Sequence, residues 1–234
     1  MRRPTTLALA AVSVVGLTLA RAGSAQDVPR PVAGGGIFVS DWKGQIDAQE
    51  ARRGAALNQS KLVQEGAALH VTTGPAVIYW KPTNVASGDY TVKATFREPQ
   101  YMNLNDHPHP YGIVVAGNDL GTDQQSLLYC ATYGNGTVIV RGFGPQSFQL
   151  NGRGGERNAA VHKAAGPGQP VEQEIAVSVR GDKITCAVNG SVIGSYDKAA
   201  VVTAGKLKST DGVYGIRFAH NAEGLVTGLT LTKP

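Results

Sequence analysis

The amino-acid sequence predicts an all-β protein, a two-sheet antiparallel β-sandwich. Apolar and polar side chains alternate in many short segments, which is the pattern of half-buried strands. Glycine is abundant, with 30 residues among 234, and turn dipeptides separate the alternating segments. Helical periodicity is scarce. Because no internal repeat is visible, propellers and solenoids are disfavoured, and a sandwich of many short strands is the best match.

Residues 1–25 are typical of a signal peptide. A basic start precedes an apolar run from Leu7 to Ala20, and Gly23 and Ala25 fit the small-residue positions of a cleavage site. An uncleaved anchor is the alternative, although the run is short for a membrane span of about 20 residues. We therefore expect an exported protein, periplasmic or extracellular, whose residues 26–234 form one β-sandwich domain.

The predicted strands follow one another along most of the mature chain. Residues 89–96 show the pattern well, because Tyr90, Val92, Ala94 and Phe96 fall on one face and polar side chains fall on the other. The remaining expected strands are residues 67–71, 111–117, 126–133, 137–143, 171–181, 183–188, 191–196, 212–220 and 224–232.

Turns and helices complete the expected elements. Asn189-Gly190 can adopt the positive φ angles of a two-residue hairpin turn, and Asn135-Gly136 gives a similar signal. One short helix or an irregular segment is expected within residues 46–63, and another short helix near Ala199. Residues 144–170 are rich in glycine and polar residues and are expected to form long surface loops.

The charge balance excludes one broad class of partner. Without residues 1–25 the chain has 19 basic and 17 acidic residues, so its formal charge falls from +5 to +2. Nucleic-acid binding requires a dense basic patch, and the charges here are scattered. We expect no nucleic-acid partner and no membrane span in the mature chain.

The chain has two cysteines, Cys130 and Cys186, and both fall in predicted strands. In an exported protein two cysteines can form a disulfide. The alternative is two separate buried thiols that behave as small apolar side chains. The sequence does not decide between them.

Several segments together resemble a known group of proteins. These are DWKGQID (41–47), TTGPAVIYW (72–80), GDYTVKATF (88–96), HPHPYGIVVAG (107–117), LLYCATYGNGTVIVRGFG (127–144) and DGVYGIRFAHN (211–221). They are similar to secreted bacterial proteins with a concanavalin A-like or laminin-G-like jelly roll, related to the 3-keto-disaccharide hydrolase domain family. The resemblance implies a sandwich whose concave face and rim loops meet glycans. It assigns no catalytic residue.

The segment LNDHPHPYG (104–112) is the most unusual one. Pro108 and Pro110 favour extended backbone at His107 and His109, which places both imidazoles on the same side. The segment could be a rigid rim loop, a sugar contact, or a metal site completed by Asp106 or by a distant His162 or His220. Zinc sites usually show a clearer ligand set, so no metal site is predicted.

Aromatic and arginine side chains supply the other candidates for a ligand site. Sugar rings stack on flat aromatic side chains, and arginine offers a fork of donors to hydroxyl and carboxylate groups. We therefore expect a cleft formed by His107, His109, Tyr111, Tyr133, Arg141 and Trp80. Trp80 precedes Lys81-Pro82 and is expected at an exposed strand end. Arg217 interrupts an apolar strand and could face either a ligand or the solvent.

Carboxylate patterns give little support for catalysis. The Glu-x-Asp-x-Glu strand motif of laminarinase-type enzymes is absent, and Glu172-x-Glu174 is more simply explained by a solvent-facing edge. Asp119 and Asp123 give only a weak signal for Ca²⁺, and no other cofactor is expected. We therefore expect a carbohydrate-binding or cell-envelope module. A glycoside hydrolase acting on a disaccharide or oligosaccharide is the alternative, and an adhesion or structural sandwich is a third.

Overall fold

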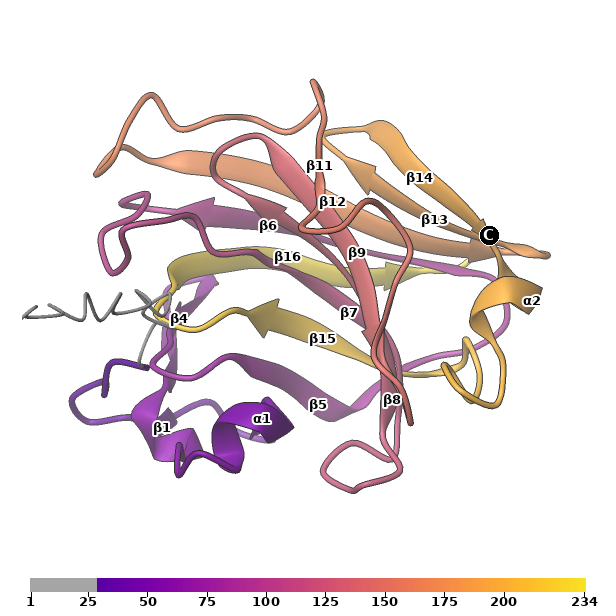
Figure 1. The fold of residues 1–234 in the computed structure, drawn as a ribbon, viewed down its shortest axis with the longest axis horizontal. Coiled ribbons are helices and arrows are strands. Elements are labelled where there is room, and N and C mark those ends of the chain that lie inside the picture. Colours follow the sequence, from indigo (N-terminus) through magenta and orange to yellow (C-terminus); the bar gives the residue numbers. More distant parts are fainter. Residues whose placement is uncertain (1–28) are drawn as a thin grey trace, which may run out of the picture.

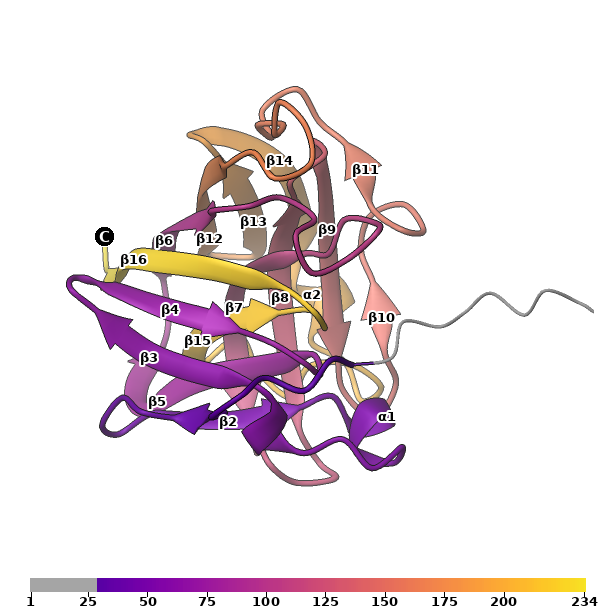
Figure 2. The same ribbon diagram turned by 90° about the vertical axis from the view of Figure 1, so that its left-hand side faces the viewer.

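The computed structural model describes residues 29–234, which form two β-sheets packed face to face (Figures 1 and 2). The predicted signal peptide, residues 1–25, lies outside the described residues. All strand pairs are antiparallel except β1 with β3. The predicted two-sheet antiparallel sandwich is therefore confirmed.

Each sheet has eight strands. The first sheet has the spatial order β1 (Gly36–Ile37), β3 (Lys61–Glu65), β4 (Ala68–Thr72), β16 (Glu223–Thr232), β6 (Tyr90–Glu98), β12 (Val171–Arg180), β13 (Lys183–Val188) and β14 (Ser191–Asp197). The second has the order β10 (Phe148–Gln149), β9 (Thr137–Phe143), β8 (Ser126–Tyr133), β7 (Tyr111–Asn118), β15 (Gly212–Phe218), β5 (Val77–Ala86) and β2 (Lys43–Ile46), and β11 (Glu156–Arg157) pairs with β9.

Helical structure is short. Between β2 and β3 lie α1 (Ala48–Ala51) and a single 3-10 turn, η1 (Leu57–Gln59), and α2 (Lys198–Val201) follows β14. The helix expected near Ala199 is therefore present. The end of the 46–63 segment differs from expectation, because residues 61–65 form strand β3 and pair with β4. The two apolar side chains there, Leu62 and Val63, are adjacent, so the segment shows no alternation that would indicate a strand.

The main core lies between the two sheets. From β6 the four apolar side chains predicted to share a face all point inward and are at most 2% exposed, and Phe96 stacks on Tyr111 and Phe218 of the second sheet. Cys130 of β8 and Cys186 of β13 form a disulfide within this core, with their Cα atoms 6.1 Å apart. One covalent bond therefore joins the two sheets.

The second sheet is unusual because both of its faces are apolar. Its outer face carries a separate buried cluster, which consists of Ile78, Trp80, Val114, Leu127, Tyr129, Ala131 and Ile139. Strand β7 is buried at every position from Tyr111 to Gly117, so it shows no polar alternation. This outer face forms the base of the candidate site.

Candidate functional site

A cleft of about 910 Å³ opens on the outer face of the second sheet. One rim is the segment that follows β2 and includes α1, and the opposite rim is β9. The end of the cleft is closed by residues 107–110 and by Ala219 and His220. Among the residues that the structure describes, none from the long loops 144–170 lines the cleft.

The strand register determines which side chains lie on the floor of the cleft. Arg217 of β15 lies beside Gly112 of β7, which lies beside Ala131 of β8, which in turn pairs with Ile139 of β9. A glycine and an alanine in the middle of this row leave room for the Arg217 side chain to reach the rings of Tyr129 and Phe143. At Gly112 a Cβ atom would lie 2.0 Å from the carbonyl oxygen of Cys130, so a larger residue would also disturb the strand pairing.

Arg217 and Asp47 form a partly buried ion pair at one side of the floor. The Arg217 Nη1 and Nη2 atoms donate to the two carboxylate oxygens of Asp47 at 2.7 and 2.6 Å. The guanidinium also lies over the ring of Tyr129, 4.8 Å from its centroid. Burial alone would lower the pKa of Arg217, but the Asp47 carboxylate outweighs burial and keeps this pKa above its ordinary value. Arg217 is therefore charged, and the two hydrogen bonds to Asp47 fix its side chain in place.

Three histidine rings cluster at the closed end of the cleft. The rings of His107 and His109 lie 4.5 Å apart and those of His109 and His220 lie 4.3 Å apart, measured between centroids. The Nε2 atoms of His107 and His109 are within hydrogen-bond distance, at 3.1 Å, and Asp106 contacts Nδ1 of His107 at 2.7 Å. This hydrogen bond to His107 lowers the pKa of Asp106. The rigid X-Pro-X-Pro backbone thus presents both imidazoles on the same side, as predicted.

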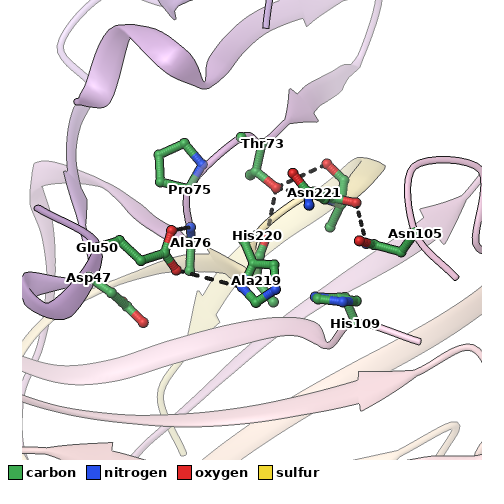
Figure 3. A network of polar contacts seen from close by, with 12 residues as sticks. Asp47, Glu50, Thr73, Pro75, Ala76, Asn105, His109, Ala219, His220 and Asn221 are labelled. Atoms are coloured by element: carbon green, nitrogen blue, oxygen red, sulfur yellow. Dashed lines mark hydrogen bonds and ion pairs between the residues drawn. The ribbon is translucent and has the colours of Figure 1, made fainter. Parts of the chain in front are cut away.

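Glu50 connects the histidine cluster to the α1 rim (Figure 3). Its Oε2 atom accepts a hydrogen bond from the backbone N–H of Ala76 at 3.0 Å, and its Oε1 atom lies 3.6 Å from Nδ1 of His220. Within residues 29–234 no group of three or more histidine, cysteine, aspartate or glutamate side chains is arranged to hold a metal ion. Asp119, considered above for Ca²⁺, instead pairs with Lys208.

Tyr133 and Arg141 form the opposite side of the cleft. Both side chains are half-buried. Burial, followed by the neighbouring Tyr129, raises the pKa of Tyr133 to about 12, so its hydroxyl stays protonated. The guanidinium of Arg141 lies over the ring of Phe143, 5.3 Å from its centroid. The Arg217 guanidinium reaches across the floor to the same ring, 5.1 Å from its centroid, so both arginines lie against Phe143.

The cleft brings together four of the six predicted residues, namely His107, His109, Tyr133 and Arg141. Tyr111 does not belong to it. Its ring is 1% exposed and stacks between the sheets on Phe96 and Phe218, because the strand alternation turns Gly112 toward the cleft instead. Whether the four residues bind a ligand remains a prediction.

Trp80 does not line the cleft either. It lies on the same outer face but is only 8% exposed, and it packs in the apolar cluster of that face. It is not at a strand end, because β5 continues to Ala86. The following Pro82 is tolerated because the register with β15 shifts there, between the pairs Trp80–Gly215 and Val85–Val213.

Sequence reasoning missed the rim that carries Asp47, Glu50 and Arg53. These residues follow β2 in a segment with good helix formers and no apolar stripe, so its local pattern indicates only a short helix. Arg217 indicated a possible site residue more clearly than this segment did, because an arginine within an apolar strand needs a polar partner or access to solvent. The two exposed carboxylates of Glu172 and Glu174 lie on β12 of the other sheet and do not line the cleft.

Comparisons with known proteins identify the fold but no family. No family model matches the chain, and no curated protein matches its sequence. The resemblance to the 3-keto-disaccharide hydrolase domain family is therefore supported only as far as the fold. No helix among residues 29–234 is long and apolar enough to span a membrane.

Several solved structures are similar at low sequence identity. A protein of unknown function with a galectin-like fold from Bacillus subtilis has a TM-score of 0.54 and 11% identity, and the match covers 82% of this chain and 89% of that one. The carbohydrate-binding module CBM66 from Bacillus subtilis gives 0.46 and 6%, covering 85% and 99%. The laminarinase catalytic domain from Thermotoga maritima MSB8 gives 0.44 and 12%, covering 83% and 84%. The chain therefore has a galectin-like, concanavalin A-like jelly-roll fold.

Proposed function

We propose that this protein is a carbohydrate-binding β-sandwich module and that the cleft on the second sheet holds the sugar. One observation carries the proposal. The cleft combines a half-buried phenol ring, a fixed guanidinium and a cluster of three imidazoles. Sugar recognition needs both a flat apolar surface for the ring and forked hydrogen-bond partners for the hydroxyl groups.

The positions of the carboxylates favour binding over cleavage. Asp47 and Glu50 are the carboxylates that line the cleft within the described part of the chain, and both come from the same rim, three residues apart. A glycosidase places its two carboxylates on either side of the scissile bond. Here Asp47 is bound to Arg217, and Glu50 is held by a backbone N–H and by His220. This arrangement suits a site that positions a sugar.

An exported location fits this proposal. The leader-like residues 1–25 direct a chain out of the cytoplasm, and a disulfide such as Cys130–Cys186 persists in oxidising compartments. We therefore place the module in the periplasm or outside the cell, where polysaccharides are available.

A glycan panel tests the proposal. The mature protein is passed through gels or columns that contain neutral and acidic polysaccharides, and both retention and the release of reducing ends are measured. We expect retention of at least one glycan without release. Tyr133→Ala should abolish this retention, because it removes the flat ring from the cleft.

Phe38→Ala is the matched control, because Phe38 is 62% exposed and does not line the cleft. Circular dichroism establishes that each variant is folded. Reducing ends that appear with the wild type and disappear in Glu50→Gln would establish the hydrolase alternative instead. Absence of retention on every glycan would overturn the proposed function.

A further inference from the structure

We propose that the sugar bound in this cleft is acidic and that Arg141 receives its carboxylate. This inference rests on the proposed function and adds the chemical class of the ligand.

The cleft has more positive than negative groups. Three arginines line it, Arg53, Arg141 and Arg217, against the two carboxylates of Asp47 and Glu50. With neutral histidines the formal balance is therefore positive by one charge. Protonation of any of the three clustered histidines would make it more positive still.

Both carboxylates are already engaged within the protein. Both carboxylate oxygens of Asp47 accept hydrogen bonds from Arg217, so this ion pair has no net charge that could attract a ligand. Glu50 accepts the Ala76 N–H and approaches His220. The positive charge that remains is on Arg53 and Arg141. No carboxylate within residues 29–234 forms an ion pair with either of them.

Arg141 is held in place without a counter-ion. It extends from β9, a strand that is paired on both sides, and its guanidinium lies over the Phe143 ring. A guanidinium that rests on an aromatic face keeps its N–H groups at the edge of the plane available as donors. Arg141 is half-buried, so less water surrounds its guanidinium than surrounds a fully exposed one. Water therefore screens an ion pair between Arg141 and a ligand carboxylate less strongly.

The position of Arg141 suits a sugar acid. Tyr133 lies on the neighbouring strand β8 and lines the same side of the cleft. A pyranose ring stacked on Tyr133 could therefore direct a carboxylate substituent toward Arg141. A guanidinium fork matches a planar carboxylate with two parallel hydrogen bonds. Arg53, on the opposite rim, adds long-range attraction for an anionic chain.

The test compares each acidic polysaccharide with its own neutral form. Polygalacturonate, alginate and hyaluronan are used in native form and after chemical reduction of their carboxylates to primary alcohols, together with neutral glucans and galactans. Affinity is measured by gel retardation and by calorimetry with oligosaccharides at low salt. We expect at least one native acidic glycan to bind about tenfold or more tightly than its reduced form.

Arg141→Gln should reduce the affinity for that glycan to the level of the reduced form. Arg180→Gln is the matched control, since it removes the same charge from an exposed position at the end of β12, on the other sheet. Its affinity should equal that of the wild type. Dextran sulfate is included in the same panel, and its binding in place of every carboxylated glycan would overturn the assignment of a carboxylate.

The outcomes separate this inference from the proposed function. Equal binding of native and reduced glycans, or binding of neutral glycans alone, would overturn the acidic ligand and leave carbohydrate binding intact. Retention of none of the glycans would overturn both. An Arg141→Gln variant that keeps the full preference for the acidic form would overturn the role of Arg141.

Discussion

At the scale of single residues, the ion pair between Asp47 and Arg217 determines the shape of the cleft. The arginine comes from the centre of a sheet and the aspartate from the rim, so their contact ties the α1 segment to the floor. The side chain of Arg217 is only 7% exposed. A buried charge that loses its partner is costly, because neither water nor another group replaces it.

We therefore expect Asp47→Asn to destabilise the protein by about 3 kcal/mol. The free energy of unfolding is measured by urea denaturation of both proteins. Glu174→Gln is the control, because it removes a carboxylate from an exposed pair with Lys93 at 3.4 Å and should change stability little. If Asp47→Asn were no more destabilising than this control, the ion pair would not fix the rim.

Glu98 gives a second prediction at this scale. This side chain ends β6, and one carboxylate oxygen accepts the Met102 N–H at 3.2 Å. Burial raises the pKa of Glu98 from 4.5 to about 7, although the hydrogen bond acts in the opposite direction. The folded protein therefore binds a proton more tightly than the unfolded chain. It follows that Glu98 makes stability fall as the pH rises from about 4.5 to 7.

Glu98→Gln should remove this pH dependence, because glutamine resembles the protonated carboxyl group. Above pH 7 the variant should be more stable than the wild type by about 1–3 kcal/mol. Urea denaturation at several pH values between 4 and 8 measures the effect, again with Glu174→Gln as the control. A variant whose stability changes with pH in parallel with the wild type would show that Glu98 is not the responsible group.

At the scale of elements, the β13–β14 hairpin shows how a local signal determines a local structure. Asn189 and Gly190 have φ angles of +49° and +80°, as expected for the two central residues of a mirror-image turn. The Asn189 side chain also bonds outside the hairpin, because its Nδ2 atom donates to the backbone oxygen of Ala160 and to Oε1 of Gln173. This turn therefore also anchors the loop before β12.

Gly190→Ala should destabilise the protein by about 1 kcal/mol, because an alanine Cβ is strained at positive φ although the surrounding space is open. Gly166→Ala is the matched control. Gly166 also has open space around it but has no positive φ, so alanine should be tolerated there. Thermal unfolding of both variants measures the difference. Equal stability of the two variants would contradict the strained-turn explanation.

At the scale of the whole molecule, the sandwich was predictable but the face that carries the cleft was not. Strand β6 alternates strictly, because one face meets the core and the other meets water. Strand β7 is buried on both faces, so its sequence does not show that Gly112 faces the cleft and Tyr111 faces the core. The burial of Trp80 depends on a shift in register, which no local pattern reveals.

The residues of the cleft were also only partly predictable from the sequence. His107 and His109 were found because their prolines restrict the backbone locally. Asp47 and Arg217 meet across 170 positions of sequence, and only the strand order of the second sheet brings them together. Sequence reasoning thus found the histidines of one loop and the side chains of Tyr133 and Arg141 on two neighbouring strands. It missed the part that requires the edge strand β2 to lie beside β5.

The Cys130–Cys186 disulfide gives a prediction for the sandwich as a whole. It joins β8 of one sheet to β13 of the other, across a sequence separation of 56 residues. Closing a loop of this length lowers the entropy of the unfolded chain, which stabilises the folded state by about 4 kcal/mol. The double variant Cys130→Ala/Cys186→Ala should lose stability of this order in urea denaturation, with both sheets still formed.

Reducing agent supplies the control, since it should destabilise the wild type and leave the double variant unchanged. Circular dichroism of the double variant should retain the β-sheet spectrum, because Val177, Ile184 and their neighbours hold the two sheets together by apolar contact. A wild type that is equally stable with and without reductant would show that the bond does not constrain the unfolded chain. Loss of the sheet spectrum in the double variant would show that the apolar core alone is too weak to maintain the sandwich.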